Sequence, residues 1–186
     1  MDIKEFFEQS AGKWFSQRTS HHLTPKPSES GQSNMVIEIL PANAPEVIQL
    51  CQRYNIEPEL ALCGAKVTWE GSVGLTSKKQ MDSTILVPVP EPDKPNEGQV
   101  LQDMGNAHKA LVAGRYILGN DDVLTLTTDS EALCSEERWW FASPNLRMRT
   151  SILKQSGGYS KVSLYTEIRM GLGQVQKQAQ DAAAKA

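Results

Sequence analysis

Most of this chain consists of short segments in which apolar and polar residues alternate, and this pattern limits the folds that it can adopt. Alternation with a period of two residues is typical of strands that bury one face. The pattern predicts ten strands, of which the last five are expected to form an antiparallel meander. Turn residues separate them at Gly119-Asn120-Asp121, Ser143-Pro144-Asn145 and Gly157-Gly158. The predicted strands are Trp14–His22, Met35–Leu40, Ala65–Val73, Ser83–Pro88, Gln99–Asp103, Leu111–Leu118, Val123–Thr128, Ala132–Ala142, Leu146–Lys154 and Tyr159–Met170.

Two short helices accompany these strands. Apolar residues recur at helical spacing between Ile3 and Ala11, which predicts a helix that packs on an apolar surface. A second helix is predicted at Ala44–Tyr54, where Asn43 and Glu46 have the spacing of a capping box. Cys51 lies on the apolar stripe of this helix and is expected in the core.

The remaining segments are predicted as loops or tail. Residues 24–34 and 89–98 are rich in proline or serine and are expected to be solvated loops, too short to separate domains. Residues 171–186 carry no strong apolar periodicity and are predicted to be a flexible tail. With 186 residues in total, the chain is expected to form one domain over residues 1–170.

Ten antiparallel strands in one domain can form either a sandwich or a closed barrel. Closure removes the exposed edge strands that invite aggregation. We therefore predict an all-β fold, a closed antiparallel barrel of the calycin and fatty-acid-binding-protein type, with an N-terminal helix. A barrel of this size encloses a cavity for one small, largely apolar molecule.

Composition excludes several classes of function. The chain has 19 basic and 22 acidic residues and a net charge of −3, so it lacks the basic excess that nucleic acid binding requires. No apolar run approaches the roughly 18 residues of a membrane span, and the first residues are acidic, unlike a signal peptide. Three widely spaced cysteines fit reduced thiols in the cytoplasm, and no cluster has the spacing of a metal site.

The first strand supplies the first candidate site residues. Gly12-Lys13-Trp14 resembles the start motif of the lipocalins, in which the Trp closes the barrel floor beneath an Arg of a late strand, here Arg169. If Trp14 points inward, Arg18 does as well, because both lie on one face of the strand. An unpaired buried charge is costly, so Arg18 is a candidate clamp for a ligand carboxylate. The alternative is a half-solvated Arg at the barrel rim.

Two longer motifs carry a specific resemblance. The segment Trp140–Ser151 reads Trp-Phe-Ala-Ser-Pro-Asn-Leu-Arg-Met-Arg-Thr-Ser, and the first strand reads Trp14-Phe15-x-x-Arg18-x-x-His21-His22-Leu23. Together they resemble the S-type phycobiliprotein lyases of cyanobacteria and plastids.

This resemblance implies a lipocalin-like barrel that takes up an open-chain tetrapyrrole, such as phycocyanobilin, as its substrate and holds no permanent cofactor. The barrel would deliver this bilin to a cysteine of an apo-phycobiliprotein subunit and form a thioether at the ring A ethylidene. It also implies a location in the cyanobacterial cytoplasm or the plastid stroma. A homodimer, or a heterodimer with a related lyase subunit, is a further expectation.

A container for a bilin needs aromatic walls, cations for the propionates, and an acid. We expect Glu136 as the acid and Arg149 as a second catalytic residue, Trp69 and Trp140 as walls, and Arg18 and Arg147 as further cations. His21, His22 and Ser151 belong to the same motifs and are expected to contact the substrate.

Strand alternation decides which of these side chains point inward. On the eighth strand Cys134, Glu136, Arg138 and Trp140 share a face, which we expect to be the inner one. On the ninth strand, Arg147, Arg149 and Ser151 share a face. Two alternatives remain: the ninth strand could turn its apolar face inward, and Glu136 could be an exposed acid paired with Arg138. A bulge could also separate the two arginines, in which case Arg149 is the better candidate.

Three functions from different classes fit these observations. The first is a bilin lyase, the second a passive carrier of a lipid or pigment, and the third a small interaction protein with a filled core. None of the three cysteines has a basic neighbour in sequence that would activate it. The acceptor cysteine is therefore expected on the partner protein.

Overall fold

The computed structural model describes residues 1–23, 27–73, 80–103, 113–129, 133–155 and 160–171. Two α-helices and a short 3-10 helix accompany ten β-strands. The helices are α1 (Ile3–Ser10), α2 (Pro45–Arg53) and η1 (Pro58–Leu60). The strands are β1 (Gly12–His22), β2 (Glu29–Pro41), β3 (Cys63–Val73), β4 (Gln80–Glu91), β5 (Lys94–Asp103), β6 (Gly114–Leu118), β7 (Leu124–Asp129), β8 (Leu133–Ser143), β9 (Leu146–Gln155) and β10 (Ser160–Arg169).

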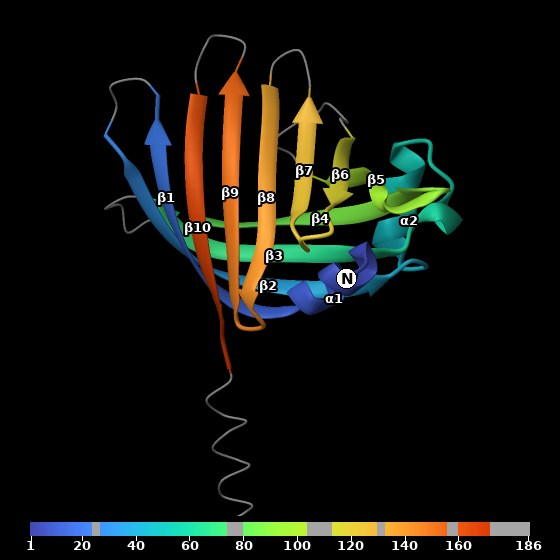
Figure 1. The fold of residues 1–186 in the computed structure, drawn as a ribbon. Coiled ribbons are helices and arrows are strands. Elements are labelled where there is room, and N and C mark those ends of the chain that lie inside the picture. The colour runs from blue at the N-terminus through green and yellow to red at the C-terminus, as the bar shows by residue number, and fades with distance from the viewer. Residues whose placement is uncertain (24–26, 74–79, 104–112, 130–132, 156–159, 172–186) are drawn as a thin grey trace, which may run out of the picture.

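The ten strands form one closed antiparallel barrel (Figure 1). Each strand pairs with its neighbour in the chain, and β10 returns to pair with β1. The predicted all-β barrel and the meander of its last five strands are confirmed. Because the ring contains ten strands, each lies across the barrel from the strand five positions away, so that β3 faces β8, β4 faces β9 and β5 faces β10.

Two predicted loops are largely strand. Residues 29–34 belong to β2, and β4 and β5 fill residues 89–91 and 94–98 of the second segment. Pro90 is tolerated because a register shift falls directly after it, at the end of the β4–β5 pairing. The predicted turn at Gly157-Gly158 and the predicted tail, apart from Gly171, lie outside the described residues.

Helix α1 closes one end of the barrel (Figure 1). Ile3, Phe6 and Phe7 are buried, as their helical spacing predicts. The helix begins with a capping box that the sequence analysis missed. The Glu5 backbone N–H donates to Asp2 Oδ1 at 2.8 Å, and the Asp2 N–H donates to Glu5 Oε2 at 2.9 Å.

Trp14 joins this helix to the barrel floor. Its side chain is fully buried, and its indole N–H donates to the Ser10 carbonyl at 2.9 Å. The guanidinium carbon of Arg169 lies 4.2 Å from the ring centroid of Trp14, and Arg169 also donates to the carbonyls of Gln9 and Ala11. The predicted floor, with Trp14 beneath Arg169, is confirmed in its geometry.

Helix α2 packs against the outer surface of β4 and β5. Val47, Leu50 and Cys51 are buried against Val87 and Leu101 in a second apolar cluster. The core position predicted for Cys51 is therefore confirmed. This second cluster lies outside the barrel, whereas the first lies inside it and includes Phe6, Phe7 and Trp14 at the floor.

The start of α2 differs from the prediction. Its N-cap is Ala44, and no side chain caps the helix. Pro45 occupies the first turn, where the missing backbone N–H costs nothing and the fixed φ angle favours a helix. The capping box predicted from Asn43 and Glu46 is wrong.

Candidate functional site

A cavity of about 380 Å³ lies inside the barrel above the floor. Side chains from every strand except β6 line it. Its volume is within the range of known ligand pockets, about 300–1,000 Å³. The alternative of a barrel with a filled core is therefore wrong.

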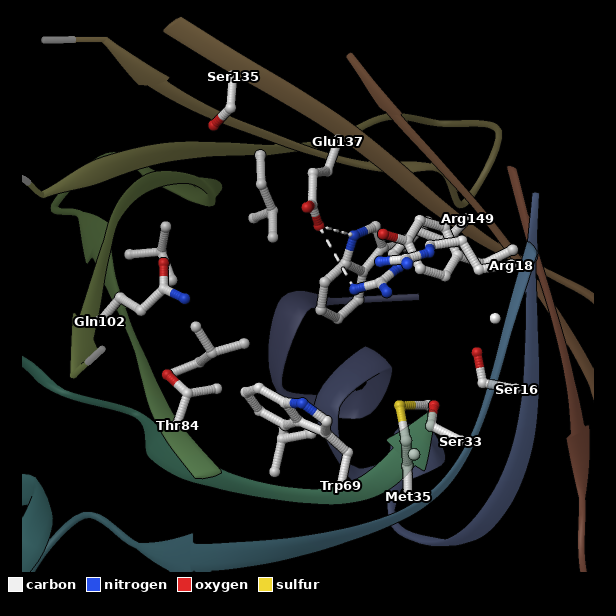
Figure 2. Close-up of a pocket in the computed structure, with 18 of the residues that line it drawn as sticks. Ser16, Arg18, Ser33, Met35, Trp69, Thr84, Gln102, Ser135, Glu137 and Arg149 are labelled. Atoms are coloured by element: carbon white, nitrogen blue, oxygen red, sulfur yellow. Dashed lines mark hydrogen bonds and ion pairs between the residues drawn. The ribbon is translucent and has the colours of Figure 1, made fainter. Parts of the chain in front are cut away.

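The cavity has one charged wall and one uncharged wall. Its charged lining residues are Arg18 of β1, Glu137 of β8 and Arg149 of β9 (Figure 2). These strands and β10 are adjacent in the ring. Strands β2 to β5 and β7 contribute apolar and neutral polar side chains, including those of Trp69 and Gln102.

A row of alternating cations and aromatic rings crosses the charged wall. Arg18 pairs with Tyr165, Tyr165 with Arg149, and Arg149 with Trp139 along adjacent strands. The guanidinium carbon of Arg149 lies 3.7 Å from the ring centroid of Tyr165 and 5.4 Å from that of Trp139. Such contacts hold the Arg149 side chain in one orientation.

Glu137 contacts this row from β8, two residues before Trp139 and on the same inner face. The Trp139 indole N–H donates to Glu137 Oε2 at 2.8 Å, and Arg149 Nη1 lies 3.7 Å from the same oxygen (Figure 2). Burial acts to lower the pKa of Arg149, but the carboxylates of Glu137 and Glu167 outweigh it and raise that pKa. Arg149 is therefore a fixed cation with a carboxylate beside it.

A buried ion pair supports the row from below. Arg147 Nε donates to Glu167 Oε2 at 2.6 Å, and the side chains are 3% and 0% exposed. Burial lowers the pKa of Arg147, although Glu167 opposes that shift. Glu167 also lies 3.9 Å from Arg149 and accepts from the Ser16 hydroxyl at 3.5 Å. Arg147 is thus a structural cation beneath the cavity, and Arg149 is the arginine that lines it.

Arg18 differs from the other two arginines because it lacks a counterion in the described part of the chain. Its Nε is buried without a hydrogen-bond partner there. Among the described residues, Arg18, Arg147 and Arg149 face two carboxylates, those of Glu137 and Glu167, which leaves one positive charge uncompensated there. An anion in the cavity would remove this cost. Arg18 is partly buried and lines the cavity, within reach of a ligand carboxylate there.

Comparison with known proteins identifies the family. The sequence model of the family described as "CpeS-like protein" matches residues 2–170. The chain belongs to the CpeS-like family. A relative named chromophore lyase CpcS/CpeS, from Thermosynechococcus vestitus, is 54% identical over 174 residues, which are 94% of this chain and 96% of the relative.

Two further relatives agree with this assignment. The phycocyanobilin lyase subunit CpcS from Picosynechococcus sp. is 39% identical over 171 residues, 91% of this chain and 86% of that protein. The solved S-type phycobiliprotein lyase CPES from Guillardia theta superposes with a TM-score of 0.81 at 34% identity, over 92% of this chain and 94% of that one. The resemblance found in the sequence is confirmed.

In this CpeS-like protein, the predicted inner face of β8 is wrong. Glu136 and Arg138 are exposed, whereas Glu137 and Trp139 line the cavity. A register shift between Phe141 and Ser143 places one extra residue in β8 beside the turn. Without this bulge, Trp140 rather than Trp139 would lie opposite Arg149. Because side chains alternate along a strand, the one extra residue turns Glu137 and Trp139 inward and Glu136 and Trp140 away from the cavity.

Trp140 therefore does not form a wall of the cavity. It lines a separate pocket together with Met1 and Gln9. Glu136 lies exposed on the outer face of β8, as the alternative interpretation expected. The acid in the cavity is Glu137.

The other predicted side chains divide between cavity, interior and outer surface. Trp69 lines the cavity, as predicted. Arg147, Arg149 and Ser151 share the inner face of β9, so the alternative in which this strand turns its apolar face inward is wrong. Ser151 and His22 are not among the residues that line the cavity. The His22 side chain is only 3% exposed, and its Nε2 lies 3.1 Å from Glu29 Oε1. His21, which was also expected to contact the substrate, is exposed on the outer face of β1, away from the cavity.

Four residues of the site were not predicted from the sequence: Glu137, Trp139, Tyr165 and Glu167. The two residues of β10 could have been found, because Tyr165, Glu167 and Arg169 lie on one face of the strand and Arg169 was already placed at the floor. The two residues of β8 had no such signal, since the bulge at Ala142 is not marked by glycine or proline.

The cysteines lie away from the cavity. Burial raises the pKa of the Cys51 thiol and raises that of Cys63 to about 11, so both are protonated at neutral pH. Cys134 is exposed on β8, on the same face as Glu136.

Other classes of site find no support within the described ranges. They contain no group of three His, Cys, Asp or Glu side chains that could hold a metal ion. No helix in those ranges is long and apolar enough to cross a membrane.

Proposed function

We propose that this CpeS-like protein is a chromophore lyase that binds an open-chain tetrapyrrole in its barrel and attaches it, through a thioether, to a cysteine of a phycobiliprotein subunit. The observation that carries this proposal is the uncompensated Arg18 guanidinium in a cavity with aromatic and apolar walls. The chromophore lyases of other species, at up to 54% identity over almost the whole chain, support it.

The cavity suits the two propionates of a bilin unequally. Arg18 has no counterion in the described structure, so the first propionate gains a charge-assisted hydrogen bond without displacing another group. Arg149 already has Glu137 at 3.7 Å and Glu167 at 3.9 Å, so a second propionate would share it. Arg18 is accordingly the primary site for a propionate.

The reaction adds a thiol across the exocyclic double bond of ring A. The S–H bond and the π bond break, the sulfur bonds to the ethylidene carbon, and a ring carbon takes up a proton, so the thiol proton and the proton gained by the ring balance. The step therefore needs a proton held at the bilin but no oxidant. Glu137 has the position to keep that proton on the bilin, the acid role that was expected of Glu136. Trp139 and Arg149 orient its carboxylate, and it can hydrogen-bond pyrrole N–H groups and hold the bilin protonated.

The acceptor thiol comes from the partner protein. Cys51 and Cys63 are buried outside the cavity and Cys134 is on the outer face. We propose phycocyanobilin as the bilin and an apo-phycobiliprotein subunit as the partner, because the Picosynechococcus relative is named a phycocyanobilin lyase subunit. That name also supports a dimer, either of two copies or with a related lyase subunit.

The domain and its location complete the proposal. Residues 1–170 form the bilin-binding domain, which the family match over residues 2–170 supports. The protein acts in the cytoplasm or plastid stroma, where its three cysteines stay reduced.

The deciding experiment mixes the protein with phycocyanobilin and an apo-phycocyanin subunit, and detects covalent bilin by zinc-enhanced fluorescence after denaturing electrophoresis. A lyase yields a fluorescent subunit band that is absent without the protein. A passive carrier shifts the absorbance of phycocyanobilin but leaves the subunit unlabelled, and that result would refute the proposal.

A substitution tests the role of Arg18. Arg18→Met should raise the Kd for phycocyanobilin by about 10- to 100-fold, because it removes one charge-assisted hydrogen bond. The dimethyl ester of phycocyanobilin has no carboxylate, so its Kd should barely change. Arg138→Met, on the exposed face of β8, is the matched control and should bind both ligands as the wild type does. Equal loss for acid and ester would contradict a carboxylate clamp.

A further inference from the structure

Gln102 lines the cavity from the inner face of β5, and its side chain ends in a primary amide. The other glutamine of the lining, Gln32 of β2, is exposed. Gln102 follows Val100 on the inner face of β5 and is partly buried. No hydrogen bond joins its side chain to the rest of the described structure. The cavity therefore contains an amide whose donor and acceptor are both available to a ligand.

The backbone around this amide is fixed. The Tyr54 hydroxyl donates to the Gln102 carbonyl at 3.0 Å from outside the barrel. On the next residue, the Asp103 carbonyl accepts from the Thr84 hydroxyl, and the Asp103 carboxylate lies 3.0 Å from Arg53. Since these contacts hold the strand without the Gln102 side chain, that side chain is not needed to stabilise the fold.

The position of Gln102 relates it to the charged wall. Strand β5 lies across the barrel from β10, so Gln102 faces the wall where Tyr165 stands between Arg18 and Arg149. Figure 2 shows Gln102 on the opposite side of the cavity from the two arginines. A ligand whose carboxylates reach the arginines therefore turns its other edge toward Gln102.

The chemistry of a tetrapyrrole fits this arrangement. Its propionates are on the two central rings, and its terminal rings are lactams. When the molecule curls to fit a barrel, the terminal rings come together on the edge away from the propionates. A lactam carries N–H and C=O on adjacent atoms, as a primary amide does, so the two groups can exchange a pair of hydrogen bonds.

We propose that Gln102 binds a terminal lactam of the substrate and so fixes which edge of the bilin faces the arginines. This inference rests on the proposed function, because it takes an open-chain tetrapyrrole as the ligand. It assigns the cavity two complementary ends, with propionates at the charged wall and a lactam at Gln102. Ligands that have a carboxylate but no lactam leave the amide unpaired and are disfavoured.

The test compares Gln102→Leu with Gln99→Leu, the same substitution on the exposed face of the same strand. Kd values are measured by absorbance titration for phycocyanobilin and for its dimethyl ester, which keeps both lactams. Gln102→Leu should raise both Kd values by about tenfold, while Gln99→Leu changes neither. Gln102→Glu, which keeps the shape but loses the N–H donors, should also weaken binding of both ligands.

The outcomes separate this inference from the function on which it rests. Unchanged binding by Gln102→Leu, or weaker binding of the free acid alone, would overturn the lactam contact. In that case the wild type would still bind, and Arg18→Met would still distinguish acid from ester. If the wild type bound neither ligand, the proposed function itself would fall.

Discussion

Replacing Glu167 by glutamine should destabilise the protein more than any exposed charge substitution. The change keeps the shape of the side chain and removes the charge that balances Arg147, whose side chain is only 3% exposed at 2.6 Å from the carboxylate. Breaking a buried ion pair by removing one partner costs about 3–5 kcal/mol. Glu167→Gln also removes the carboxylate 3.9 Å from Arg149, so we expect the upper part of that range.

Removing the cation should cost less than removing the anion. In Arg147→Met, Glu167 keeps Arg149 at 3.9 Å and the Ser16 hydroxyl at 3.5 Å, so its charge retains partners. The matched surface control is Glu97→Gln. Glu97 lies 3.1 Å from Arg115, but these side chains are 32% and 52% exposed, and such pairs contribute less than about 1 kcal/mol.

The assay is equilibrium unfolding in urea, followed by tryptophan fluorescence, with thermal melting as a second measurement. For a chain of this size about 2–4 °C is lost per kcal/mol, so a cost of about 4–5 kcal/mol should make Glu167→Gln melt roughly 8–20 °C below the wild type. The double variant Arg147→Met/Glu167→Leu should recover most of the loss, because an apolar pair replaces a buried ion pair at little cost. A Glu167→Gln protein no less stable than Glu97→Gln would refute this reasoning.

Two further predictions concern the acid and the floor. Glu137→Gln should still bind phycocyanobilin but transfer it about 10²- to 10⁴-fold more slowly. Glu136→Gln, on the outer face, should transfer it at the wild-type rate. Single-turnover labelling of the apo-subunit at saturating bilin measures both transfer rates. Equal rates for the two variants would exclude Glu137 as the acid. Arg169→Met removes the donors to the carbonyls of Gln9 and Ala11 at the end of α1. It should lower the free energy of unfolding by about 1.5–3 kcal/mol and speed amide hydrogen exchange in that helix. Unchanged exchange would contradict the anchoring role of Arg169.

The fold was predictable from the sequence because its strands are long and their alternation is local. All ten strands of the described structure follow from the alternation, with errors mainly at their ends. The errors at residues 24–34 and 89–98 share a cause. Serine and proline favour loops in isolation, but pairing with β1 extends β2 back to Glu29, and the β4–β5 pairing extends both of those strands.

The candidate site was predictable only where the side-chain alternation runs without interruption. On β1 and β9 the alternation from Trp14 to Arg18 and from Arg147 to Arg149 is regular, and the predicted orientations are confirmed. On β8 a single bulged residue at Ala142 exchanges Glu136 for Glu137. The hydrogen-bond register between β8 and β9 decides which of the two glutamates faces the cavity, and the residue types of β8 do not reveal that register.

The topology explains why the charged wall is where it is. Arg18 comes from the first strand and Tyr165 from the last, and they become neighbours only through the β1–β10 pairing that closes the ring. The row of Arg18, Tyr165, Arg149 and Trp139 therefore crosses the closing seam of the barrel. Because this pairing joins the two ends of the chain, it has the longest loop to close and depends on the preceding strands for alignment. The propionate site and the buried pair below it are consequently complete only in the closed barrel, and an open sheet with the same strands would lack them.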